Sequence, residues 1–401
     1  MGDDVDVLTV RPLTAADAAA SQQLGYEAFG VPSSPPTEPP SIDRPGRFYL
    51  GAFDGDTLVA RLADRAYDSC FGGVLVPTSG IASVTVAAEY RGQGGLSPLV
   101  LEALRRARDR GALISTLFPT ASRIYRKFGY EVIADFVTVQ LPTTVLAAVP
   151  QPAAVRTRRA VPADVEVIRA VYDAWAIAQN GPLSRRGISF TATAHEFLAG
   201  FTGVTVAVDD TDAICGYASW SRGQGYGEQA VISVTDLLAT SADGYRALLA
   251  MVGSFASVTA ITKIDTSGDD LARLFLPTLQ WQVLDSSPYM LKILDVPGAI
   301  SGRRYPPGLT THLHFRLQGD FLTENDGGYA IGVADGRAEC VRAEPGGDRV
   351  LTPQGLALLY AGAQSSANLR AAGHLSGGEI EQDLDWDALF GGRQLHIRDY
   401  F

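Results

Sequence analysis

A glycine-rich turn between an expected strand and an expected helix, within residues 81–110, constrains the chain more than any other segment. Residues 81–86 are rich in β-branched side chains and predict a strand. Residues 91–95, Arg-Gly-Gln-Gly-Gly, follow, and glycines at such a junction let the backbone approach a ligand while free N–H groups at the helix start face an anion. The segment predicts a pyrophosphate cradle or, equally, an ordinary glycine-rich turn. The apolar residues after the turn share one helical face: Leu96, Leu99, Val100, Ala103, Leu104 and Ala107.

The spacing excludes two common phosphate-binding motifs. No Gly-Lys-Ser/Thr follows the turn, as a P-loop would require, and no Gly-x-Gly-x-x-Gly occurs after a first strand. Some 30 residues later, after an expected strand at 113–118 and a short helix starting at 120–122, the chain has Tyr125-Arg-Lys-Phe-Gly-Tyr130. By itself, Tyr125 fits a core tyrosine of an amphipathic segment equally well.

Taken together, the two motifs resemble those of the Gcn5-related N-acetyltransferase (GNAT) family. The turn matches the family's Gln/Arg-x-x-Gly-x-Gly/Ala coenzyme A loop at Arg91 and Gly94, but the last position is Leu96. The second run matches Phe/Tyr-Tyr-x-Lys-x-Gly-Phe/Tyr, including Tyr125 and Gly129. Both motifs stand in the family's order, which implies an acetyltransferase fold. A proline-rich loop at 31–45 is expected to form a wall or lid of the cleft.

A later part of the chain then echoes the first. Residues 142–155 carry no charge and predict a domain boundary. The segment 158–164 echoes 11–17, and 233–235 (Ser-Val-Thr) repeats 83–85. Ser241 stands where Arg91 stands in the first copy, and Asp243 replaces a glycine, so the second copy would repel a pyrophosphate. We expect it to bind no coenzyme A.

The last hundred residues differ from both copies. Alternating apolar residues and glycine turns predict an antiparallel sheet, with a helix at 351–360, and the domain resembles the sterol-carrier fold. His312 and His314 share a strand face, but without a third ligand solvent-facing positions are favoured and no metal is expected. The fold class predicted is α+β: a catalytic GNAT domain (1–142), a degenerate GNAT-like domain (143–292) and a sterol-carrier-like domain (293–401).

Charge and composition restrict the partners. A net charge of −11 argues against nucleic acid and suits a small cationic substrate, although most acidic proteins are acidic only for solubility. No apolar run is long enough for a membrane span. Three well-separated cysteines and an acidic N-terminus without the features of a signal peptide predict a cytoplasmic protein.

Over its full length the chain resembles the actinobacterial "enhanced intracellular survival" (Eis) acetyltransferases, which share the departure at Leu96. The resemblance implies a homohexamer, a trimer of dimers, that uses acetyl-CoA to acetylate aminoglycosides at several amines and, in some members, lysines. It implies Tyr125 as general acid and the terminal carboxylate of Phe401 as general base. It also implies coenzyme A contacts from Val84, Thr85, Val86, Arg91, Gly92, Gln93, Gly94, Gly95, Leu96, Ser97, Thr120 and Ala121.

The implied chemistry needs help from the site. A free α-carboxylate has a pKa near ~3.5 and an alkyl ammonium near ~10, so the carboxylate is a poor base unless burial raises its pKa or a water relays the proton. Tyr125 would protonate the leaving thiolate, and transfer would be direct, without a covalent intermediate.

The alternative is a non-catalytic binding protein with a vestigial acetyltransferase domain, carrying an apolar ligand in its C-terminal domain. The Arg91 loop and Tyr125 are intact, which argues against this alternative. The second copy, with Ser241 and Asp243 in the corresponding turn, shows how a copy that has lost the motif differs.

Overall fold

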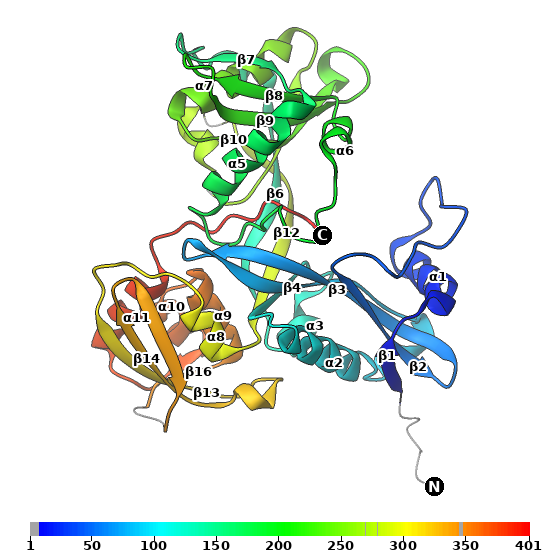
Figure 1. The fold of residues 1–401 in the computed structure, drawn as a ribbon, viewed down its shortest axis with the longest axis vertical. Coiled ribbons are helices and arrows are strands. Elements are labelled where there is room, and N and C mark those ends of the chain that lie inside the picture. Colours follow the sequence, from blue (N-terminus) through cyan, green and yellow to red (C-terminus); the bar gives the residue numbers. More distant parts are fainter. Residues whose placement is uncertain (1–7, 269, 279, 345–347) are drawn as a thin grey trace.

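The computed structural model describes residues 8–268, 270–278, 280–344 and 348–401, which form three lobes (Figure 1). Residues 1–7, on which the expectation about a signal peptide partly depends, lie outside the described residues. Within the described chain, no helix has the length and apolarity to cross a membrane.

The first lobe is a twisted sheet with helices on both faces. Its elements, in order, are β1 (Thr9–Pro12), η1 (Ala15–Asp17), α1 (Ala18–Phe29), β2 (Arg47–Asp54), β3 (Thr57–Phe71), β4 (Val74–Val86), η2 (Ala88–Tyr90), α2 (Leu96–Asp109), β5 (Ile114–Leu117) and α3 (Ser122–Arg126). The predicted apolar stripe of α2 is buried from Leu99 to Ala107, and Leu96 is half-buried. β2 and β3 form an antiparallel hairpin.

The second lobe repeats this order with small changes. It comprises α4 (Thr143–Ala147), β7 (Arg156–Arg159), η3 (Pro162–Asp164), α5 (Val165–Ala176), α6 (Ala194–Ala199), β8 (Gly203–Val208), β9 (Ile214–Arg222), η4 (Gly227–Gln229), β10 (Val231–Ala239), α7 (Ala242–Gly253), η5 (Ser254–Ser257), β11 (Ile261–Thr266) and η6 (Leu271–Phe275).

The sequence echo corresponds to one repeated contact. The guanidinium of Arg11 binds the carboxylate of Asp17 at 2.8 Å, and that of Arg158 binds Asp164 at 2.6 Å, each joining a first strand to the following helix. The charge-free segment 142–155 is not an open linker throughout, because α4 forms within it and buries Leu146. The duplication is thus visible in structure as well as in sequence.

Two long strands join the lobes into a single sheet. β6 (Glu131–Pro142) and β12 (Gln282–Ile293) pair with each other; β6 also pairs with β11, and β12 with β5. The resulting order is β1-β2-β3-β4-β5-β12-β6-β11-β10-β9-β8-β7. The last strand of the second copy therefore completes the first lobe, and the last strand of the first copy completes the second (Figure 1). A domain boundary at residue 142 places β6 in one domain and its partners β11 and β12 in the next. The predicted domain limits therefore remain predictions.

The third lobe packs helices on a small sheet. Its elements are α8 (Val296–Ser301), β13 (Thr311–Leu317), η7 (Thr323–Asn325), β14 (Gly327–Ala334), β15 (Arg337–Arg342), β16 (Val350–Leu351), α9 (Pro353–Ala361), α10 (Ser366–Ala371), β17 (Leu375–Ser376), η8 (Ile380–Gln382) and α11 (Asp383–Phe390).

The sheet of the third lobe is mixed rather than purely antiparallel. Its order is β15-β14-β13-β16-β17, and β16 runs parallel to β13 because it returns to the free edge of β13 after the β14–β15 hairpin. His312 and His314 are exposed on β13, as expected for solvent-facing positions. Beyond α11, residues 391–401 form neither helix nor strand; in Figure 1 this red segment ends near the crossing of β6 and β12.

Candidate active site

The centre of the first lobe is the place where β4 and β5 separate. They pair in parallel only from Thr78–Ile81 against Ile114–Leu117, while β4 continues to Val86 beside β3 alone. A bulge opens at Ser83, whose φ of 52° is left-handed. Beyond Ile81 one side of β4 therefore has no strand neighbour, and its backbone amides are open to an extended amide-containing ligand.

The glycine-rich turn lies at the same end of β4 and leads into α2. Gly92 and Gly94 have φ of 82° and 83°, which side chains tolerate poorly, and both are exposed. Arg91 is exposed and its Nε donates to the carbonyl of Val86 at 3.2 Å. The α2 N-terminus begins after Gly95, and no side chain caps it. A positive helix end, a guanidinium and free backbone donors suit a diphosphate.

Tyr125 lies in α3, just after the end of β5. Its side chain is buried in the core beneath α2 and its ring meets that of Tyr130 edge-on at 6.2 Å. Burial raises the pKa of Tyr125 to about 12. Among the described residues the phenol hydroxyl has no hydrogen-bond partner, which leaves it free for a ligand. Thr120 and Ala121 are exposed at the start of the same helix.

A buried polar chain supports the wall on which Tyr125 packs. Ser115 Oγ and the Tyr130 hydroxyl are 2.6 Å apart, and Ser115 Oγ also donates to the carbonyl of Ser79 at 3.1 Å. Ser79 Oγ donates to Asp64 Oδ1 at 2.7 Å, and Asp64 pairs with Arg110 at the end of α2. Sequence reasoning missed this chain; its only signal was a few polar residues inside otherwise apolar strands.

The C-terminal residue packs on the first lobe. The ring of Phe401 lies 5.0 Å from that of Tyr67, 5.5 Å from Phe118 and 6.2 Å from Tyr289, centroid to centroid. A Cβ placed on Gly80 of β4 would come within 2.9 Å of Phe401 Cε2. The chain end is therefore beside the last paired residues of β4 and β5.

Phe401 and Tyr125 approach that point from opposite faces of the sheet. Successive residues of a strand point to opposite faces. Ser79 faces the α2 side, where Asp64 and Arg110 lie, so Gly80 faces the other side together with Phe401. Tyr125 belongs to the core under α2. The buried side chain of Tyr125 and the ring of Phe401 thus lie on opposite faces of the sheet, near the end of the β4–β5 pairing.

The corresponding turn of the second lobe is shorter, and a side chain caps the helix that follows it. β10 ends at Ala239 and α7 begins at Ala242, whereas residues 87–95 separate β4 from α2. Ser241 caps α7 by accepting from the Gly244 N–H at 3.1 Å, and Asp243 places a negative charge in the first turn. This geometry favours the prediction that the second lobe binds no coenzyme A.

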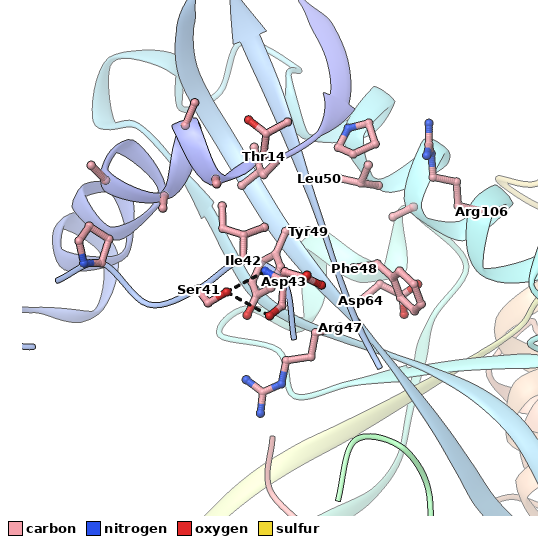
Figure 2. A pocket seen from close by; sticks show the side chains of 18 of the residues that line it. Thr14, Ser41, Ile42, Asp43, Arg47, Phe48, Tyr49, Leu50, Asp64 and Arg106 are labelled. Carbon is pink, nitrogen blue, oxygen red and sulfur yellow. Dashed lines mark hydrogen bonds between the residues drawn. The ribbon is translucent and has the colours of Figure 1, made fainter. Parts of the chain in front are cut away.

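Two of the cavities beside the first lobe lie away from the glycine-rich turn at residues 91–95. One, of about 960 Å³, lies at the sheet edge where β1 ends. In Figure 2, Tyr49 lies beside Ile42 and Asp43 of the loop, whereas Phe48 lies beside Asp64. Neither Tyr125 nor Phe401 lines it. The other, of about 330 Å³, lies between α1, the proline-rich loop and Arg61.

The smaller cavity is on the Phe401 face of the sheet. Arg61 Nη1 donates to Ser21 Oγ of α1 at 2.6 Å. Arg65, four residues further along β3, has its guanidinium carbon 5.9 Å from the centroid of the Phe401 ring. Arg61 and Arg65 point to the same face of β3. Tyr26 and Phe29 line this cavity together with Pro32 and Pro36 of the proline-rich loop. Within the described residues no cluster of three metal-ligating side chains occurs.

The fold and the site define a class: two tandem GNAT-type lobes followed by a sterol-carrier domain. Family models match accordingly, an acetyltransferase (GNAT) domain at residues 9–133, a second at 190–293 and a sterol carrier protein domain at 296–397.

Individual relatives show which members of this class the chain is similar to. An uncharacterized N-acetyltransferase of Streptomyces griseus is 27% identical over 99% of this chain and 100% of its own length. N-acetyltransferase Eis of Mycobacterium tuberculosis is 27% identical over 76% of this chain and 75% of its own length. A GCN5-related N-acetyltransferase from Kribbella flavida superposes with a TM-score of 0.85 at 27% identity, with all of both chains covered. Eis1 from Mycobacterium abscessus shares the fold, with a TM-score of 0.76 at 23% identity over 98% of this chain and 100% of its own. The chain is therefore a GNAT-type acetyltransferase, and it is similar to the N-acetyltransferases named Eis.

Proposed function

We propose that this acetyltransferase moves the acetyl group of acetyl-CoA directly to primary amines of small polycationic acceptors, foremost aminoglycosides and secondarily lysine side chains. The observation that carries the proposal is the approach of Tyr125 and Phe401 from opposite faces to the opening between β4 and β5. A thioester in this opening would have an acid on one side and a carboxylate on the other.

GNAT domains use acetyl-CoA as cosubstrate, and the residues around the opening suit it. The open side of Val84, Thr85 and Val86 would hold the pantetheine amides. The turn from Arg91 to Ser97 would hold the diphosphate, and Thr120 and Ala121 would flank the arm between them. What acetyl-CoA supplies is an activated acetyl group and a thiolate that needs a proton on leaving.

Tyr125 is suited to provide that proton. Its pKa of about 12 keeps the phenol protonated across the physiological range, and its hydroxyl is not used by another described side chain. General-acid assistance of this kind is worth typically 10²–10⁴-fold in rate.

The terminal carboxylate has a harder task. Deprotonating an alkyl ammonium is uphill for an ordinary α-carboxylate by ~6.5 pKa units, roughly 9 kcal/mol. We therefore assign it two roles, holding the cationic amine by charge and passing its proton on through water. The aromatic packing of Phe401 on Tyr67 and Phe118 limits the freedom of the chain end, as such roles require.

The choice of acceptor rests on charge and shape. The net charge of −11 favours a cation, and the cavity lined by Tyr26 and Phe29 opens on the Phe401 face. A thiol-release assay over a panel of aminoglycosides, simple polyamines and lysine peptides tests this: turnover of aminoglycosides at more than one amine, resolved by product mass, is expected. Turnover of none of these amines would overturn the acceptor assignment.

A homohexamer, built as a trimer of dimers, remains part of the proposal through the family resemblance, and a cytoplasmic location remains part of it because the three cysteines lie far apart. Light scattering coupled to size exclusion gives the assembly mass directly. A monomeric, fully active protein would contradict the hexamer.

The binding-protein alternative has less support. The interior of the third lobe is filled by large side chains, with Trp386 and Phe315 packed edge-on at 5.5 Å. Calorimetric titration with acetyl-CoA separates the two functions, because a protein without measurable affinity for the cosubstrate cannot be the enzyme proposed.

A further inference from the structure

The second lobe has an opening of the same kind as the first, and it is occupied. β10 and β11 pair in parallel only from Val231–Val234 against Ile261–Ile264, and β10 bulges between Val234 and Asp236. This repeats the parting of β4 and β5 at the equivalent point of the repeat.

The occupant is Arg398, three residues from the C-terminus. Its Nη1 donates to the carbonyl of Thr235 at 3.3 Å and also to the carbonyl of Asp265. Thr235 and Asp265 are the first residues past the last paired positions of β10 and β11. The guanidinium therefore bridges the two strands where they part, the position that corresponds to the proposed acetyl-CoA site of the first lobe.

The residues on both sides of Arg398 are tied to the second lobe as well. His396 Nε2 is 3.2 Å from Asp270 Oδ2, and its ring meets Trp175 edge-on at 4.9 Å. The Asp399 carboxylate accepts from Arg185 Nε at 2.9 Å and from the Tyr172 hydroxyl at 3.1 Å.

Arg185 joins the chain end to the strand that parts. Besides Asp399, it binds Asp236 of β10 at 2.6 Å. The side chains of Asp236 and Arg398 are only 2% and 1% exposed. Removing one partner of a buried ion pair leaves an uncompensated charge and destabilises the fold, so each charge requires its partner.

We propose that the former cosubstrate cleft of the second lobe is the binding site for the chain's own segment 396–399, and that Arg185 is the residue that positions the chain end through Asp399. The assignment of a catalytic benefit rests on the proposed role of Phe401; the binding of the segment does not. Phe401 follows Asp399 by two residues, a reach of at most ~7 Å, so a displacement at Asp399 is passed on to the terminal carboxylate.

Binding of segment 396–399 would be the function of the degenerate copy. Where the first lobe keeps a long glycine-rich turn for a diphosphate, the second has a short capped turn and holds a peptide segment between its parted strands. The duplication thus yields one cleft for the cosubstrate and one for the residues that carry the base.

The test uses the full-length protein and the variant Arg185→Ala, with Arg186→Ala as the matched control, since Arg186 binds only the more exposed Asp173 and Glu166. Carboxypeptidase digestion followed by mass spectrometry measures how fast Phe401 and Tyr400 are released. We expect release at least tenfold faster than wild type in Arg185→Ala, and unchanged in Arg186→Ala. We also expect kcat to fall at least tenfold in Arg185→Ala, with the KM for acetyl-CoA within twofold of wild type.

Asp399→Asn provides a second variant should Arg185→Ala fold poorly, because it keeps the size of the side chain and removes only its charge. Wild-type resistance to the carboxypeptidase in a folded Arg185→Ala or in Asp399→Asn would overturn the inference, whatever the turnover. A released chain end with undiminished kcat would instead overturn the positioning role and, with it, the assignment of Phe401. If the wild type transfers no acetyl group, the proposed function fails while the digestion still decides the binding of the segment.

Discussion

Phe401 contacts Gly80, the residue of β4 just before the last position at which β4 pairs with β5. A Cβ at residue 80 would come within 2.9 Å of Phe401 Cε2 and 2.6 Å of Tyr67 Cε2. Glycine at this position is therefore required by the close approach of two aromatic rings, since its φ is not in the left-handed region.

Gly80→Ala should displace the chain end and lower kcat by about tenfold, while acetyl-CoA binding along the open part of β4 beyond Ile81 stays within twofold. The reason is that both rings must shift by several tenths of an ångström, and ~1 Å of misplacement can cost ~10²-fold in rate. Steady-state kinetics and calorimetry measure the two effects. Gly187→Ala is the control, because nothing lies within 4 Å of its would-be Cβ; equal losses in both variants would contradict the argument.

Tyr125→Phe should lower kcat by at least 10²-fold and leave the dissociation constant of acetyl-CoA within about threefold. The phenol is assigned only to protonation of the leaving thiolate, so its removal should affect the transition state and not cosubstrate binding. Full activity in Tyr125→Phe would remove Tyr125 from the mechanism.

The pH dependence of kcat should reflect the burial of Tyr125. A phenol donates a proton only in its protonated form, and burial raises its pKa to about 12, so the donor is present at every pH below that value and is lost only above it. We expect no decline of kcat between pH 8 and 10, where an ordinary tyrosine begins to ionise. A decline in this range that disappears in Tyr125→Phe would show that the phenol has an ordinary pKa.

Adding one glycine after Phe401 should cut turnover by at least tenfold. The extension moves the terminal carboxylate by ~3.5 Å and leaves a peptide bond in its place. Phe401→Leu is the matched control, because it keeps both the length of the chain and the carboxylate, and it should retain more activity than the extended chain. If the extended and wild-type chains acetylate equally fast, the carboxylate is not the base.

Gly94→Ala should weaken acetyl-CoA binding by about tenfold. Its φ of 83° costs a side-chain-bearing residue ~1–2 kcal/mol, and relaxation of the turn would rotate the backbone donors away from the diphosphate. Gly111→Ala is the control, since Gly111 has a φ of 89° and equally open surroundings at the far end of α2. Both variants should lose similar stability in thermal unfolding, but only Gly94→Ala should lose affinity in calorimetry.

The features predictable from sequence are those whose cause lies within a few residues. The buried stripe of α2 follows from apolar residues at helical spacing, and the β2–β3 hairpin follows from alternation around a short turn. The repeated Arg11–Asp17 and Arg158–Asp164 pairs join residues six apart, so the repeat of the chain was visible as a repeat of letters. The positive-φ glycines at 92 and 94 likewise reflect a local demand of the turn.

Tertiary structure decided the rest, because the partners are distant and nothing local encodes their register. The exchange of β6 and β12 is set by long-range pairing within one sheet, of β12 with β5 and of β6 with β11. The polar chain links Asp64, Ser79 and Ser115 on three strands with Tyr130 just before β6, and it becomes continuous only when these segments come together. Local sequence was sufficient to predict two GNAT-like copies and one glycine-rich turn, residues 91–95, that suits a diphosphate. Only folding determined that the second copy holds Arg398 between its parted strands and that Phe401 contacts Gly80, since both contacts depend on the path of the chain through all three lobes.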